Sequence, residues 1–70
     1  MESIEIITEY IKLEQLLKLA EAVESGADAK ACIQEGLVKV NGKIELQRGK
    51  KLRKGDRIDY DGKQYLICTA

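Results

Sequence analysis

Eight lysine and arginine residues fall within a nineteen-residue stretch of this 70-residue sequence, and only Glu45 and Asp56 oppose them there. Cations gathered on a rigid support can contact phosphate groups, so the chemistry that this stretch offers is the binding of a polyanion. We call residues 39–57 the basic segment. Its cations are Lys39, Lys43, Arg48, Lys50, Lys51, Arg53, Lys54 and Arg57.

The charges are unevenly distributed along the sequence, although 12 lysines and arginines balance 12 acids overall. Residues 1–36 hold three bases and eight acids, whereas residues 37–70 hold nine bases and four acids. Two arrangements are compatible with this composition. The surface is either a mixture of locally paired charges or divided into an acidic side and a basic side, the latter able to follow a polyanion.

Catalytic and metal-binding chemistry finds little support in the sequence. It contains no histidine, which removes the imidazole base, the catalytic triad and the usual zinc site. Cys32 and Cys68 are far apart and are predicted to be reduced, packed thiols. No glycine-rich nucleotide-binding loop is present. We therefore expect no enzyme activity, no cofactor, no metal and no small-molecule substrate.

The sequence also carries information on where the protein works. No window of about 18 consecutive apolar residues occurs, so no membrane-spanning helix is predicted. The first residues include Glu2, Glu5 and Glu9, which is the wrong charge for a secretion signal. We expect a cytoplasmic protein with no membrane association, formed by a single domain of residues 1–70 with a small core.

The first half of the sequence is predicted to form a short strand and two helices. Residues 3–8 are rich in the β-branched side chains that favour strands. An apolar stripe at helical spacing follows: Leu13, Leu16, Leu17, Ala20 and Val23. Ser25 is placed to cap a second helix that ends at Gly36. The second helix has its own stripe, expected to pack against the first in a helix-turn-helix-like pair: Ala29, Cys32 and Ile33.

A hairpin is predicted after the second helix, with Asn41 and Gly42 in its turn. A two-residue turn would pair Val40 with Lys43 and so place a valine beside a charge. A three-residue loop with Gly42 as a bulge would instead pair Lys39 with Lys43, and apolar residues would then face apolar ones. We favour the bulged loop, which puts both lysines on one exposed face.

A second hairpin is predicted near the end of the sequence. Strands over residues 57–60 and 63–68 flank Asp61-Gly62, and a two-residue turn there keeps apolar and aromatic side chains on one face. Between the two hairpins, Leu52 is the single apolar anchor of a dense basic run.

Two further features bear on polyanion binding. The turn at Ser25 and Gly26 offers backbone N–H groups at a helix N-terminus, which suits a phosphate, although Asp28 opposes it. The three tyrosines are too few to stack a row of bases. The pattern therefore favours recognition of RNA shape and backbone over recognition of sequence.

Four stretches combine residue types at spacings found in a known family: Lys12-Leu13-Glu14, Ser25-Gly26-Ala27-Asp28-Ala29-Lys30, residues 33–43, and Leu52-Arg53-Lys54-Gly55-Asp56. Together they resemble the RNA-binding domain named after ribosomal small-subunit protein S-four. The stretch at residues 45–52 is similar to one in small stand-alone bacterial members. Two positions depart from the family pattern, since Gly26 stands where many members carry arginine and Gln47 replaces a second frequent arginine.

The resemblance implies an α+β fold of the alpha-L type, with two short packed helices against a small, mostly antiparallel sheet. It implies a non-enzymatic module that contacts structured RNA, either rRNA or tRNA, in association with the ribosome; we expect a monomer. Together with the basic segment it predicts these RNA-binding residues: Lys12, Ser25, Gly26, Lys30, Lys39, Asn41, Lys43, Arg48, Lys50, Lys51 and Arg53.

One function of a different class remains open at this point. The acidic first half could instead form a helix face that docks a basic protein partner, which would make the chain a protein-interaction module.

Overall fold

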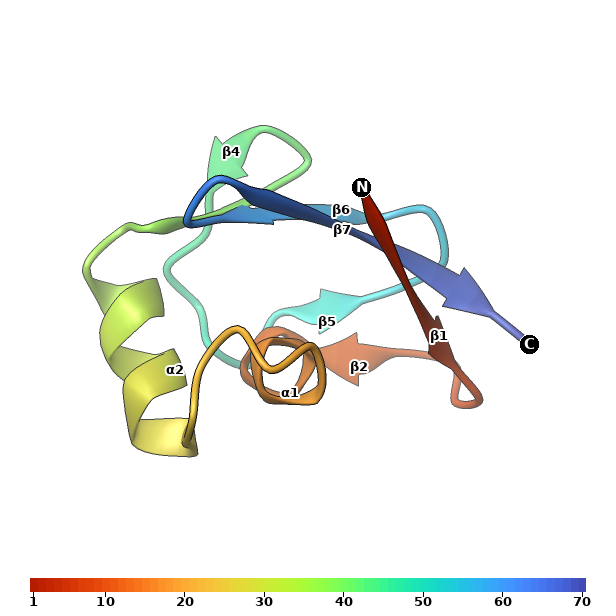
Figure 1. The fold of residues 1–70 in the computed structure, drawn as a ribbon, viewed down its shortest axis with the longest axis horizontal. Helices are drawn as coiled ribbons and strands as arrows, with labels where there is room; N and C mark the ends of the chain where they lie inside the picture. Colours follow the sequence, from red (N-terminus) through yellow and green to blue (C-terminus); the bar gives the residue numbers. More distant parts are fainter.

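Two helices lie on one side of a five-stranded sheet in the computed structural model, which describes residues 1–70 (Figure 1). A separate two-stranded ribbon lies beside the first helix. In chain order the elements are β1 (Glu2–Ile6), β2 (Ile11–Lys12), α1 (Leu13–Leu19), α2 (Gly26–Gln34), β3 (Val38–Val40), β4 (Lys43–Ile44), β5 (Lys51–Leu52), β6 (Arg57–Tyr60) and β7 (Lys63–Thr69). The predicted α+β class is confirmed. Neither helix has the length and apolar character needed to cross a membrane.

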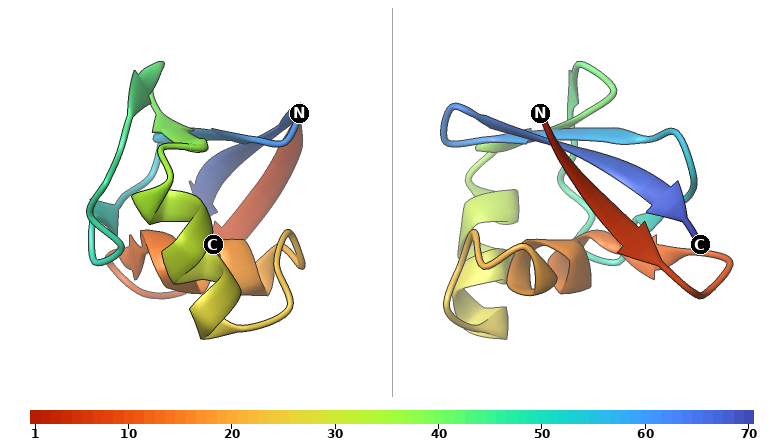
Figure 2. Two further views of the ribbon diagram at one scale, coloured as in Figure 1. Left: turned by 90° about the vertical axis from the view of Figure 1, so that its left-hand side faces the viewer. Right: turned by 45° about the vertical axis from the view of Figure 1, so that its right-hand side comes forward.

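The sheet has the strand order β1-β7-β6-β3-β4, and every pair in it is antiparallel except the first. β1 runs parallel to β7 with Ile4 opposite Ile67, so strands from the two ends of the chain lie side by side (Figure 2). The prediction of a mostly antiparallel sheet is confirmed. The parallel pair was not predicted, because its two strands are separated by nearly the whole sequence.

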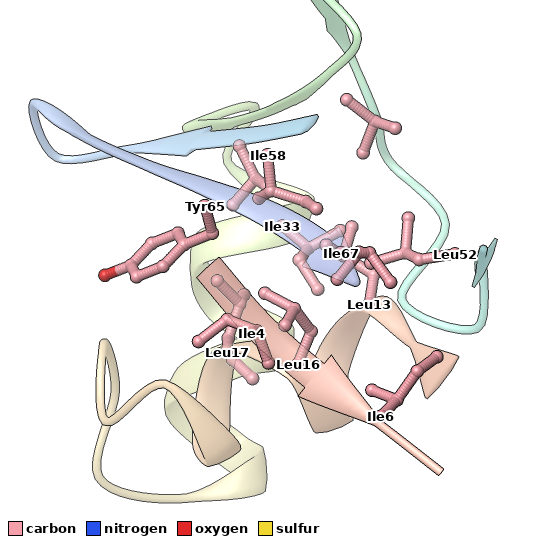
Figure 3. Close-up of a cluster of buried hydrophobic side chains, with 13 residues drawn as sticks. Ile4, Ile6, Leu13, Leu16, Leu17, Ile33, Leu52, Ile58, Tyr65 and Ile67 are labelled. Atoms are coloured by element: carbon pink, nitrogen blue, oxygen red, sulfur yellow. The ribbon is translucent and has the colours of Figure 1, made fainter. Parts of the chain in front are cut away.

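Thirteen buried hydrophobic side chains form one core between the sheet and the helices (Figure 3). They are Ile4, Ile6, Leu13, Leu16, Leu17, Ala29, Ile33, Val38, Val40, Leu52, Ile58, Tyr65 and Ile67. Ala29 and Ile33 of α2 are fully buried, and Cys32 is partly buried and packs against the same cluster. The predicted packing of the second helix on the first is therefore confirmed.

Both ends of α2 have the predicted capping residues. The Ser25 side-chain Oγ accepts a hydrogen bond from the backbone N–H of Asp28 at 3.2 Å, which satisfies one free donor of the first turn. At the other end Gly36 has a φ of +75°. The backbone N–H of Leu37 then reaches the Cys32 carbonyl at 3.1 Å, as in a Schellman cap.

The turn between β3 and β4 differs from the predicted one. Val40 pairs directly with Lys43 across a two-residue turn, so the predicted three-residue bulged loop is wrong. Asn41 and Gly42 both have positive φ, 52° and 84°, as a type I′ turn requires. Positive φ at Gly42 itself was predicted correctly.

The prediction failed because it required apolar side chains to face one another across the hairpin. β4 is a two-residue strand at the edge of the sheet, and its Ile44 remains 58% exposed opposite Lys39. The Asn41 side chain, in addition, is bonded to residues 56 and 57, which favours the tight turn. The second hairpin has the predicted two-residue turn, with Tyr60 paired to Lys63.

Replacing Ile33 by alanine is expected to destabilise the protein by about 2–5 kcal/mol, because the side chain is fully buried against both layers. Urea denaturation measures the change. Leu37→Ala is the matched control, since the same kind of truncation at a side chain that is 53% exposed should cost less than about 0.5 kcal/mol. Equal effects of the two truncations would contradict the helix packing described above.

Replacing Gly42 by valine is expected to cost more than about 1 kcal/mol, because a β-branched residue tolerates positive φ poorly. Gly49→Val is the control. Gly49 lies outside the positive-φ region and, like Gly42, has open space where a Cβ would sit. Thermal unfolding measures the loss of stability in both variants, which differ in the backbone strain at the substituted position. If Gly49→Val is as unstable as Gly42→Val, positive φ is not the cause of the destabilisation.

Candidate nucleic-acid interface

The ribbon of β2 and β5 attaches the basic segment to the first helix. Ile11 pairs with Leu52 and Lys12 with Lys51. Two backbone bonds extend this attachment, from Leu13 N–H to the Lys50 carbonyl at 2.9 Å and from Glu14 N–H to the Arg48 carbonyl at 3.0 Å. The predicted anchor Leu52 is fully buried, which confirms its role. The cations of residues 48–53 therefore stand on a backbone that is held in place.

A hydrogen-bond network around Asp56 connects the β3–β4 turn to the end of the basic segment. The Asp56 carboxylate accepts from the Asn41 side-chain N–H at 3.1 Å and from the Arg53 backbone N–H at 2.8 Å. The Asn41 side-chain oxygen accepts from the Arg57 backbone N–H at 2.9 Å. The Asn-Gly and Gly-Asp motifs singled out from the sequence are thus parts of one structure, and most of the Asn41 amide is engaged within the protein.

The predicted site cations are all exposed and lie in three regions. Lys12, Lys51 and Arg53 lie on or next to the ribbon, and Arg48 and Lys50 lie in the loop before it. This loop descends along one edge of the molecule from β4 to the start of α1 (Figure 2, left). Lys39 and Lys43 lie in the β3–β4 hairpin, and Lys30 lies on α2.

Lys39 and Lys43 do not share a face, so that prediction is wrong. Side chains alternate between faces along a strand, and directly paired residues share one. Lys39 pairs with Ile44 in one neighbouring strand and with Asp59 in the other, whereas Lys43 pairs with Val40. Lys39 is therefore on the sheet face away from the helices, with an acid beside it.

The N-terminus of α2 carries Ser25 and Gly26, and a further cation lies next to it. The ammonium of Lys18 is 3.9 Å from the position that a Cβ would occupy at Gly26. The Ser25 hydroxyl oxygen is used by the cap, so its free donor is the hydroxyl hydrogen. The sequence did not identify Lys18 as a candidate site residue. The helical pattern predicted only that it is exposed on the first helix, not that it lies next to the start of α2.

Tyr10 is a second residue that the sequence reasoning missed. The Lys51 ammonium lies 4.9 Å from the centre of its ring and the Arg53 guanidinium 5.7 Å, within the range of cation–π contacts. These contacts depend on the pairing of β2 with β5, which brings together residues more than forty positions apart. No local pattern signals such a contact.

The acidic residues have a region of their own. Glu24, Asp28 and Glu35 are the only charged residues around a recess of about 340 Å³ that also contains Cys32 and Tyr60. The thiol of Cys32 and the hydroxyl of Tyr60 are hydrogen-bonded at 3.0 Å. This bond, followed by burial, raises the pKa of Tyr60 to about 12. The phenol therefore stays neutral at physiological pH, and the charge of this recess comes from the carboxylates.

Solved structures share this fold. The solution structure of YbcJ from Escherichia coli, which reveals an alpha-L motif involved in RNA binding, aligns with a TM-score of 0.74. It is 33% identical, and the alignment covers 97% of this chain and 87% of that one. The 30S ribosomal protein S4e of Thermoplasma acidophilum aligns with a TM-score of 0.64 at 24% identity, over 84% of this chain and 31% of its own, which shows similarity of fold.

Curated relatives match over similar lengths. The probable ribosome maturation protein RlbA of Bacillus subtilis is 44% identical over 59 residues, which are 84% of this chain and 83% of RlbA. The putative RNA-binding protein YbcJ of Escherichia coli is 42% identical over 53 residues, 76% of each chain. The sequence profile of the S4 domain matches residues 4–68. With its alpha-L fold and this nearly complete match, the chain belongs to the S4 domain family.

Proposed function

We propose that this protein is a non-enzymatic RNA-binding module that holds the phosphate backbone of structured RNA on its ribbon and the loop before it. The observation that carries the proposal is the pairing of Lys12 with Lys51. Directly opposed like charges, with Cβ atoms about 4.5–5.5 Å apart, destabilise a strand pair. A phosphate between the two ammonium groups converts this repulsion into attraction, so the pair favours a bound polyanion.

The rigidity of the basic segment supports the proposal. Ordering a flexible loop on binding would reduce the affinity that its cations provide. Here the carbonyls of Arg48 and Lys50 are bonded to the first turn of α1, and Leu52 is buried. Exposed cations on a fixed backbone can therefore meet successive phosphates with little loss of conformational entropy.

The names of the relatives guide the choice of RNA. One is a probable ribosome maturation protein and another a putative RNA-binding protein. We propose structured rRNA as the target ahead of tRNA, and the cytoplasm, where ribosomes are assembled, as the compartment.

The proposed contacts form a main region and a minor one. The main region consists of the ribbon, its loop and the tip of the hairpin: Lys12, Lys43, Arg48, Lys50, Lys51 and Arg53. The minor region is the start of α2, with Ser25, Gly26 and Lys30 as contacts and Lys18 beside them. Asn41 is assigned a positioning role, because its amide binds Asp56 and Arg57. Lys39 is assigned a weaker role, because Asp59 lies opposite it.

The recess lined by Glu24, Asp28 and Glu35 is the observation that favours a second candidate function, the docking of a basic protein segment. Such docking would depend on the acidic residues and not on the ribbon. Charge reversal on the ribbon should therefore weaken RNA binding but not docking of a basic segment, and charge reversal in the acidic recess should do the opposite.

Reversing Lys50 and Lys51 to glutamate is expected to weaken RNA binding and to flatten its salt dependence. Each lost phosphate contact should reduce the slope of log affinity against log salt by about 0.7–0.9. Stability should change little, because the lost contact of Lys51 with Tyr10 is offset by removal of the repulsion from Lys12. Titration of an rRNA fragment at two salt concentrations measures the affinity and its slope.

Two controls accompany this variant. Lys63→Glu makes the same kind of charge change at an exposed residue of the β6–β7 hairpin and should leave RNA binding nearly unchanged. Glu21→Lys with Glu24→Lys should not weaken binding. RNA affinity that falls equally in all three variants, or that is indifferent to Lys50 and Lys51, would refute the proposed site.

Replacing Gly26 by arginine is expected to strengthen RNA binding, because it restores the cation that many family members carry at the start of the second helix. The site has room, since a Cβ there meets nothing closer than the Lys18 ammonium at 3.9 Å. The salt slope should steepen by about 0.7–0.9 for the added contact. Gly26→Ala controls for helix propensity, and Gly26→Glu should weaken binding. Identical affinity of the arginine and glutamate variants would exclude the start of α2 from the interface.

A further inference from the structure

A recess of about 580 Å³ lies between the end of the β1–β2 connection, β2 and the exposed side of α1. Tyr10, Ile11 and Leu19 supply its apolar and aromatic wall, and Lys12, Gln15 and Lys18 supply its polar groups. Its volume falls in the range of roughly 300–1,000 Å³ that is usual for small-molecule sites. We call it the Tyr10 recess. Of the residues assigned to RNA contacts above, Lys12 also lines the recess, and so does Lys18, which lies beside the minor region.

We propose that the Tyr10 recess accepts one unpaired nucleotide of the bound RNA, with its base stacked on the Tyr10 ring. This inference rests on the proposed function and names the feature of the RNA that the protein recognises. It makes Tyr10 a specificity-determining residue, whereas the cations of the ribbon bind any RNA backbone that reaches them.

The surroundings of Tyr10 prepare the ring for stacking. Lys51 and Arg53 lie over the ring, at 4.9 and 5.7 Å from its centre, and neither of them lines the recess. Tyr10 therefore lines the recess together with residues other than the two cations that lie over its ring. The backbone carbonyl of Tyr10 also accepts a hydrogen bond from the Thr8 hydroxyl at 2.8 Å, which fixes the chain before β2. A ring held in this way loses little freedom when a base stacks on it.

The polar groups of the recess suit the remainder of a nucleotide. The ammonium groups of Lys12 and Lys18 can bind its phosphate or a base carbonyl. The amide oxygen of Gln15 accepts from the Lys12 backbone N–H at 3.3 Å, so the amide NH₂ is the end available to an acceptor on the base. An aromatic wall, two cations and an amide donor together match a base with its phosphate.

Continuity with the ribbon identifies the occupant as part of the RNA. Lys12 lines the recess and pairs with Lys51, so a backbone bound at this pair passes the mouth of the recess. A base stacked inside a duplex cannot reach a side wall of the protein, so the nucleotide must come from a bulge, a loop or a strand end. The recognised RNA is therefore a helix interrupted by an unpaired nucleotide.

Two RNA hairpins with identical stems, one fully paired and one with a single bulged adenosine, test the inference. Wild-type protein should bind the bulged RNA about 10-fold more tightly, the ratio that one stacked base provides. Tyr10→Ala should reduce the ratio of the two dissociation constants to near one, and Tyr10→Phe, which retains the ring, should restore most of it. Lys63→Glu, outside both regions, should leave the ratio unchanged.

A second measurement uses only the wild-type protein, so its result does not depend on whether a variant folds. 2-Aminopurine in place of the bulged adenosine should lose fluorescence when wild-type protein binds, because its base stacks on a ring. Equal binding of both hairpins, or a bulged base whose fluorescence does not fall, overturns the Tyr10 recess while leaving the proposed backbone contacts intact. Failure to bind either hairpin, or binding indifferent to Lys50→Glu with Lys51→Glu, overturns the proposed function itself.

Discussion

Leu52 is the one buried residue between Val40 and Ile58, and the arrangement of the basic half depends on its burial. Its side chain belongs to the core, and its backbone pairs with Ile11 immediately before the first helix. Burial of a leucine contributes about 1.5–3 kcal/mol, a large fraction of the stability of a small domain. Together with the backbone bonds from Leu13 and Glu14, this side chain holds the loop of cations in a fixed position.

The same attachment creates one unfavourable and one favourable contact between side chains. It places Lys12 opposite Lys51, which is unfavourable in the free protein, and it places Tyr10 beneath Lys51 and Arg53, which is favourable. Since every lysine and arginine of the chain is exposed, water and salt screen the repulsion, and the core tolerates it. Repulsion between cations that a bound phosphate would neutralise is typical of a surface that binds polyanions.

The charge asymmetry seen in the sequence has a counterpart in the fold. The ribbon and its loop carry cations on one edge, and the recess around Cys32 and Tyr60 carries carboxylates and no base. The hydrogen bond to Cys32, followed by burial, raises the pKa of Tyr60 to about 12, so the Tyr60 phenol adds no negative charge to this recess at physiological pH. The negative charge of this recess opposes the approach of a polyanion from this side of the molecule.

Local signals in the sequence were sufficient for much of the fold. The apolar stripes, the Ser25 cap, the Gly36 helix end, the Asp61-Gly62 turn and the Leu52 anchor were all predicted, because each depends on residues within a few positions of one another. The cations of the candidate site could be identified in the same way, from composition and family resemblance, and all of them are exposed.

The tertiary structure decided the features that depend on distant partners. The parallel pairing of β1 with β7, the β2–β5 ribbon and the Tyr10 contacts each join residues 39 or more positions apart, and no periodicity encodes such pairs. The register of the β3–β4 hairpin was predicted wrongly for the same reason. Local side-chain sorting favoured a bulge, but the bonds of Asn41 to Asp56 and Arg57, together with an edge strand that leaves Ile44 exposed, select the two-residue turn. The sequence determined where the cations lie along the chain, and only the long-range contacts determined which of them stand together.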